Sequence, residues 1–192
     1  MRVVALLLFT ALTCMPAPGL ADDGYKQLFQ TVSGQISIDD QKAVYRSLDL
    51  TYDEKRSTFS SEKQGDSLVF EIEVMDLNHD GTPELFISGG STGTTDAAGC
   101  SVWLFIRTNG KYHQNLGFPA TSYTILEESV HHGFPDIQFG GQGFYDTIWR
   151  WNGHDYAYVQ SVPIEAKEIE EKIRPMLKDH AVDGVPFDPT PE

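Results

Sequence analysis

Residues 76–84 read DLNHDGTPE, and every second position from 76 to 80 carries a side-chain oxygen. A hard divalent cation needs six to eight oxygen ligands, and calcium accepts carboxylate, amide and backbone oxygens together. A tightly curled loop aims Asp76, Asn78 and Asp80 inward, and Gly81 permits the sharp turn. We therefore expect a calcium site whose ligands are Asp76, Asn78, Asp80, the carbonyl of Thr82, and Glu84.

The donor set favours calcium over zinc, because zinc prefers histidine and cysteine ligands. The loop also differs from a helix–loop–helix calcium site, whose bidentate acid stands at the twelfth position, here Ile87. With its ligands all engaged, the ion would contribute to folding and would leave no open position for hydrolysis. The alternative is an Asx-rich turn that satisfies its own backbone and binds no ion.

The segments around this loop predict strands. Between residues 67 and 158, alternating or β-branched runs are separated by Gly, Asn and Asp clusters. Asn109-Gly110 and Asn152-Gly153 predict hairpin turns, because both residue types tolerate positive φ. The expected strand runs are 68–75, 85–88, 102–107, 136–139, 147–151 and 156–159.

Helical patterns flank the β region on both sides. Residues 25–50 include apolar positions that share a helix face, with Ser37 or Asp39 as the cap, and residues 164–177 form an amphipathic pattern after Pro163. We expect a mainly β (α+β) fold: a two-repeat antiparallel sheet or partial propeller with an N-terminal and a C-terminal helix. The expected segments are a signal peptide (1–21), a helical and loop segment (22–66), the β-repeat core (67–162) and a helix with an acidic tail (163–192).

The β region contains an internal repeat. GTPEL at 81–85 matches GFPDI at 133–137, and an Asn-Gly turn followed by a tyrosine ends each unit. The aromatic strand at 102–105 is aligned with 148–151. The positions that match the calcium loop are Glu128, Val130, His132 and Asp136. This second loop is expected to bind no ion, because valine cannot ligate. Zinc is not expected there either, because the adjacent histidines 131 and 132 point to opposite faces of a strand.

The aspartate-rich loop between two strands resembles the β-hairpin loops of FG-GAP and VCBS-type repeat proteins. The resemblance covers roughly 15 residues around the first loop and extends weakly to the second repeat. It implies a calcium-stabilised β-repeat module and does not specify an activity.

The first residues predict export. Arg2 precedes an apolar run from residue 3 to about 12, and small residues end at Ala21, the expected cleavage point. A lipid-attachment site at Cys14 is the less favoured alternative, because Leu12 and Thr13 are larger than such sites tolerate. No later segment predicts a membrane span, so we expect a periplasmic or secreted protein that does not insert into the membrane.

The formal net charge is −14 at pH 7, and loss of Arg2 makes it one unit more negative. Such a field disfavours nucleic acid as a partner and favours cations and basic proteins. After cleavage, Cys100 is the single cysteine, so no internal disulfide is expected. It is interpreted as a small packed residue and not as a nucleophile.

No nucleophile motif is present, and catalysis is not expected. Two glycine-rich segments at matching repeat positions, 88–99 and 140–146, are instead the candidate partner-binding loops, because exposed loops carry function more often than strands do. A plain connection between strands is the alternative for both. The candidate contact residues are Ser88, Gly89, Ser91, Thr92, Gln142, Phe144, Tyr145 and Asp146.

The leading hypothesis is an exported calcium-binding protein, without catalysis, that binds or inhibits another envelope protein. It resembles, at a distance, periplasmic lysozyme inhibitors and immunity proteins, which implies a basic peptidoglycan-cleaving enzyme as the partner; their Ser-Gly loop followed by tyrosine has no clean match here. One alternative is an envelope hydrolase whose site is dispersed over His79, His113, Asp146 and His154. Another is a calcium-stabilised adhesion or carbohydrate-contact module, which predicts two or more exposed aromatic residues on one face.

Overall fold

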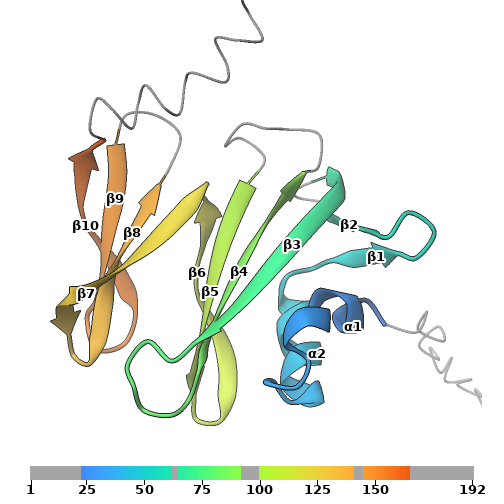
Figure 1. Cartoon of the computed structure of the whole chain (residues 1–192), viewed down its shortest axis with the longest axis horizontal. Helices are drawn as coiled ribbons and strands as arrows, with labels where there is room; N and C mark the ends of the chain where they lie inside the picture. Colours follow the sequence, from blue (N-terminus) through green and yellow to red (C-terminus); the bar gives the residue numbers. More distant parts are fainter. Residues whose placement is uncertain (1–22, 62–64, 92–99, 141–144, 165–192) are drawn as a thin grey trace, which may run out of the picture.

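The computed structural model describes residues 23–61, 65–91, 100–140 and 145–164. Two antiparallel sheets form most of this part, and helices cover the outer face of the larger sheet (Figure 1). The mainly β fold with two repeats and an N-terminal helical portion is confirmed. The signal peptide and, apart from Ile164, the expected C-terminal helix lie outside the described residues.

The larger sheet has six strands, in which each strand pairs with the next along the chain. The smaller sheet has four strands in the order β10-β9-β8-β7. The strands are β1 (Thr51–Asp53), β2 (Thr58–Ser61), β3 (Gly65–Met75), β4 (Glu84–Ser91), β5 (Cys100–Thr108) and β6 (Lys111–Pro119), followed by β7 (Ser122–His131), β8 (Phe134–Gly140), β9 (Tyr145–Trp151) and β10 (Tyr156–Pro163).

The N-terminal portion contains α1 (Gly24–Leu28), a short 3-10 turn η1 (Gln30–Val32) and α2 (Ile38–Ser47). The Ser37 hydroxyl accepts a hydrogen bond from the backbone N–H of Asp40, so the expected cap is present. Val44 and Tyr45 on α2 are buried against the larger sheet. None of the helices in the described ranges is long and apolar enough to span a membrane.

Alternation along the strands of the larger sheet produces two apolar layers. Leu68, Ile72, Leu85 and Phe105 face the helices and form the first cluster. The second cluster lies between the two sheets. Its members come from the other face of the larger sheet and from the smaller sheet, and include Phe86, Val102, Leu104, Leu116, Ile137, Phe139, Trp151 and Tyr156.

The internal repeat corresponds to β3–β6 and β7–β10. In each unit a tyrosine on the last strand donates a 2.8 Å hydrogen bond to a proline carbonyl: Tyr112 to Pro83, and Tyr156 to Pro135. The sequence match around both prolines is therefore a match in structure as well.

The alignment of the aromatic strands is wrong by two residues. Leu85 pairs with Phe105 and its equivalent Ile137 pairs with Trp149, so Phe105 corresponds to Trp149 and not to Trp151. Two strands, β6 and β7, were also absent from the expected strand runs. The end of the expected helical and loop segment (22–66) contains the β1–β2 hairpin, which pairs with β3 and extends the larger sheet.

Candidate metal centre

The calcium-type loop joins β3 to β4 at the lower end of the larger sheet in Figure 1. The β3–β4 ladder ends at the Met75–Glu84 pair, so the loop starts directly after the last paired residue. His79 has a φ of 57° and Gly81 a φ of 84°. These two left-handed residues curl the backbone and bring its N–H groups toward the acidic side chains.

Asp76 and Asp80 accept most of the hydrogen bonds inside the loop. The carboxylate of Asp76 accepts from the backbone N–H of Asp80 at 3.1 Å and of Gly81 at 2.9 Å. Asp80 accepts from the N–H of Thr82 at 2.7 Å and from the Asn78 amide at 3.0 Å, and both bonds lower the pKa of its carboxyl. The Asn78 oxygen accepts from the N–H of Asp80 at 3.1 Å. The loop therefore holds its carboxylates by an Asx-type network.

Glu84 is the buried acid of this loop, with a side chain that is only 1% exposed. Its Oε2 atom accepts a 2.9 Å hydrogen bond from the backbone N–H of Leu77. Burial, followed by the negative charges of Asp80 and Asp76, raises the pKa of its carboxyl to about 7. Three carboxylates are thus close enough to repel one another, which a bound cation would relieve.

Four of the expected ligands lie in the loop: Asp80 is exposed, and Asp76, Asn78 and Thr82 are half-buried. The fifth, Glu84, is the first residue of β4. Within the described ranges, no three Asp, Glu, His or Cys side chains are at a spacing that could hold a metal ion. The donor types fit calcium, since a carboxylate oxygen that accepts one N–H bond keeps a further lone pair for a cation.

The equivalent acid of the second repeat, Asp136, has a different environment. It is 2% exposed, and Arg150 binds it through Nη2 at 2.7 Å and Nε at 3.1 Å, while the Ser129 hydroxyl donates a third bond at 2.9 Å. Burial would raise the pKa of this carboxyl, but the bonds from Arg150 and Ser129 outweigh it and hold the pKa below its usual range. Here a guanidinium neutralises the buried acid.

The connection between β7 and β8 has fewer residues than the connection between β3 and β4. His131 pairs with Phe134, so only His132 and Gly133, both with positive φ, connect β7 to β8. The β7–β8 connection is thus a two-residue turn, in contrast to the curled β3–β4 loop.

The first repeat has no base at the position of Arg150. Continuing the β4–β5 ladder one residue beyond the Leu85–Phe105 pair places Ile106 opposite Glu84, and Ile106 is buried and apolar. The groups whose charges shift the Glu84 pKa are both carboxylates. The sequence analysis did not identify Arg150 as the partner of Asp136. The available signal was a single arginine between two tryptophans, on the strand that follows the one with the repeat-matched aspartate.

The two candidate partner-binding segments start from the same end of the molecule. The Ala120 N–H bonds to the Cys100 carbonyl at 3.3 Å, and the Thr121 N–H bonds to the Gly140 carbonyl at 2.8 Å. One short connection therefore ties the beginning of β5 to the end of β8. Ser88, Gly89 and Ser91 lie on β4, and Tyr145 and Asp146 lie on β9; Thr92, Gln142 and Phe144 are outside the described residues.

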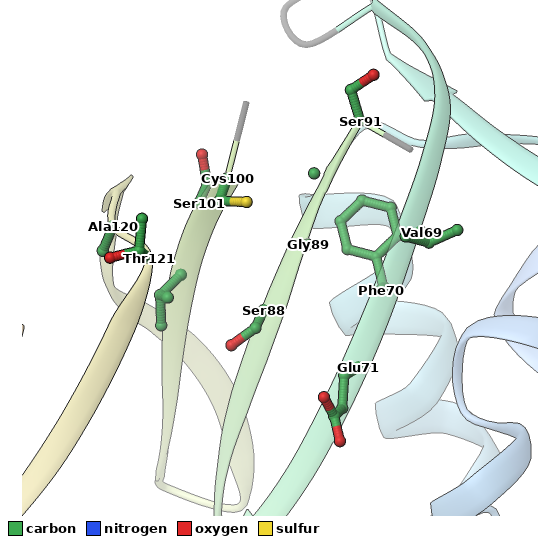
Figure 2. Close-up of a pocket in the computed structure, with 12 residues that line it drawn as sticks. Val69, Phe70, Glu71, Ser88, Gly89, Ser91, Cys100, Ser101, Ala120 and Thr121 are labelled. Atoms are coloured by element: carbon green, nitrogen blue, oxygen red, sulfur yellow. The ribbon is translucent and has the colours of Figure 1, made fainter. Parts of the chain in front are cut away.

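A pocket of about 310 Å³ opens at this upper end, and Figure 2 shows the residues that line it. Ser88, Gly89 and Ser91 are among the residues that line it. Asp146 does not: it is buried, and it accepts a 2.9 Å hydrogen bond from the Gln138 amide on β8. Tyr145 is 59% exposed.

The four residues of the dispersed-hydrolase alternative do not form one site. His79 lies in the β3–β4 loop, and Asp146 is the second residue of β9, at the other end of the sheets. His113 and His154 line one pocket of about 300 Å³ near the β9–β10 turn, where the His154 ring is paired with Asp155 at 2.8 Å.

No protein-family model, curated protein or solved structure matches this chain.

Proposed function

We propose that this chain is an exported, non-catalytic calcium-binding protein that binds another protein of the cell envelope. The residues that would hold the ion are Asp76, Asn78, Asp80, the Thr82 carbonyl and Glu84. The ion would supply positive charge to a buried carboxylate and fix the β3–β4 connection.

The observation that carries the metal proposal is the contrast between the two repeats. At equivalent positions the chain buries Glu84 and Asp136, and a buried carboxylate is strongly unfavourable unless it is neutralised or paired. Arg150 pairs with Asp136. Glu84 has two further carboxylates near it and an apolar residue opposite it. A cation in the first loop would place a positive charge beside Glu84, as Arg150 does beside Asp136.

Calcium titration of the chelator-treated protein tests this directly. We expect calcium to raise the melting temperature and to bind with one-to-one stoichiometry, with magnesium as a weaker competitor. Asp76→Asn should abolish this binding. Asp49→Asn is the matched control, because it makes the same chemical change at an exposed position outside the loop. Asp49 has positive φ, which asparagine tolerates. Equal calcium responses of the two variants, or no response of the wild type, would refute the metal site.

The protein-binding part of the proposal is supported by charge and by the position of the candidate loops. A formal net charge of −14 steers the chain toward basic proteins, and peptidoglycan-cleaving enzymes are often basic. The inhibition test adds the purified protein to a basic lysozyme and measures cell-wall lysis at low and moderate salt. Absence of both inhibition and complex formation at low salt would count against this partner class.

A carbohydrate-contact module is a second candidate, because two exposed tyrosines share a face of the smaller sheet. Tyr145 and Tyr158 are 59% and 54% exposed. Tyr158 pairs with Trp149, which is four residues from Tyr145 on the same strand, so all three rings are on one side. Fluorescence titration with soluble peptidoglycan fragments tests this alternative; a response that is lost in the double Tyr145→Ala, Tyr158→Ala variant would favour it.

A further inference from the structure

The pocket of about 310 Å³ shown in Figure 2 is a groove across the upper end of the larger sheet, on the face that is turned toward the smaller sheet. Its floor consists of small residues, among them Ser88, Gly90 and Cys100 on adjacent strands. Val69 and Glu71 on β3 form one side, and Thr121 after β6 closes the other (Figure 2). The groove exists because neighbouring positions on β4 and β5 carry so little side-chain volume.

The strand register shows which residues of β3, β4 and β5 lie side by side on this face. Glu71 pairs with Ser88, which pairs with Val102; two residues further along β3, Glu73 pairs with Phe86. The ring of Tyr123 on β7 stacks on Phe86, with centroids 4.1 Å apart and planes inclined by 8°. The groove therefore ends at an aromatic wall that carries a second glutamate beside it.

Glu71 and Glu73 lie on the face of β3 that is turned toward this wall, because Ile72 between them packs in the cluster on the helix side. Burial and then the charge of Glu73, with a smaller effect of Glu71, raise the pKa of the Tyr123 hydroxyl. The two glutamates alternate with Ile72 on one strand, so their Cα atoms are about 7 Å apart. A long side chain that lies along the groove would reach both of them.

Neither carboxylate is neutralised within the chain as far as it is described. Glu71 and Glu73 are exposed and form no ion pair with a described base, whereas Asp136 and Asp40 are paired with Arg150 and Arg107. The two carboxylates thus stand beside a groove with an apolar and aromatic lining. No basic group of the described residues neutralises them.

We propose that this groove receives a lysine or arginine side chain of the protein partner, an inference that rests on the protein-binding part of the proposed function. The aliphatic stem packs against Val69, Val102 and the Tyr123 ring, and the cationic end lies between Glu71 and Glu73. The overall acidity of the chain steers a basic surface toward this end of the molecule.

Chemical-shift mapping on the isotope-labelled protein tests the groove by itself. The probes are acetyl-arginine amide and acetyl-lysine amide, and the control is acetyl-citrulline amide, which has the shape of arginine without its charge. We expect both cationic probes to shift the amide signals of Glu71, Ser88 and Ser101, and we expect no response to citrulline. Shifts spread evenly over the acidic surface, or no shifts, would overturn the proposal.

A charge-matched pair of variants then tests the partner. Glu71→Gln with Glu73→Gln should weaken binding of the cationic probes and of a basic lysozyme at least about five-fold. Glu127→Gln with Glu128→Gln removes the same charge from exposed positions on β7 and should leave binding nearly unchanged. Equal losses in both variants would show that only long-range attraction acts. Calcium affinity, measured in parallel, should be the same in both, so failure of the groove is distinguishable from failure of the metal site.

Discussion

Replacing Glu84 by glutamine should stabilise the calcium-free protein and destabilise the calcium-bound protein. Glutamine keeps the shape of the side chain and an oxygen that accepts the Leu77 N–H bond. It removes the negative charge. Without calcium this charge has no positive partner in the loop, so its loss is favourable; with calcium the charge binds the ion, so its loss is unfavourable. The same substitution is therefore expected to have opposite effects in chelator and in calcium.

The size of the effect follows from the pKa of the buried carboxyl. Burial moves it from 4.5 to about 7, which corresponds to about 3 kcal/mol when the group is ionised. Because the surrounding loop is exposed, water screens part of this cost, and we expect about 2 kcal/mol at pH 9. For a domain of this size that is a rise in melting temperature of roughly 4–8 °C.

The sign of the pH dependence is fixed by proton uptake. Between about pH 4.5 and 7 the calcium-free folded chain holds a proton on Glu84 that the unfolded chain has released, so stability falls as the pH rises through this window. The difference between wild type and Glu84→Gln should be small at pH 5 and full at pH 9.

Thermal and urea unfolding at both pH values, in chelator and in calcium, measure the four combinations. Glu128→Gln, an exposed acid on β7, is the control and should show no pH-dependent difference from wild type. The reasoning fails if the difference between wild type and Glu84→Gln is independent of pH in chelator. The metal assignment fails if calcium stabilises Glu84→Gln as much as it stabilises the wild type.

Three further substitutions probe the repeat architecture, each by equilibrium urea unfolding followed by tryptophan fluorescence. Arg150→Met should destabilise the protein equally with and without calcium, because it strands the buried Asp136 carboxylate; rescue by calcium would contradict this. Tyr156→Phe removes a buried hydrogen bond and should cost about 1–2 kcal/mol, and Tyr112→Phe, its half-buried counterpart, should cost less; the reverse order would contradict the burial argument. Gly89→Ala should cost about 1–3 kcal/mol because its Cβ would overlap an aromatic ring on β3, and unchanged stability would contradict that packing.

The elements with distinctive backbone chemistry could be predicted from the sequence. Asn109-Gly110 forms the expected two-residue turn, with positive φ at both positions and the Thr108–Lys111 pair closing it. The GTPEL and GFPDI matches also placed the two prolines correctly. These signals are reliable because few residue types tolerate such conformations, whatever the tertiary context.

The missed and misaligned strands have physical reasons. β6 and β7 are edge strands of their sheets, and each exposes a large share of its residues, so neither shows a clear apolar alternation. The aromatic strands were aligned two residues out of frame, because side chains on a strand repeat with period two and either frame places aromatic residues on the same face. The pairing of Ile137 with Trp149 distinguishes the two.

The role of Arg150 depends on this register and so was not accessible from spacing alone. Once Trp149 is opposite Ile137, its neighbour Arg150 reaches Asp136 across the ladder, and the repeat acquires its own cation. The two repeats bury an acid at the same place. A covalently tethered guanidinium pairs with Asp136 in the second repeat, and under the proposed function an exchangeable ion would neutralise Glu84 in the first. A guanidinium neutralises its partner at any ion concentration, whereas calcium bound in the first repeat would make the stability of that repeat depend on the ion concentration. Since β3 and β4 also carry Glu71 and Ser88, a calcium ion in the β3–β4 loop would stabilise the sheet that forms most of the proposed binding groove.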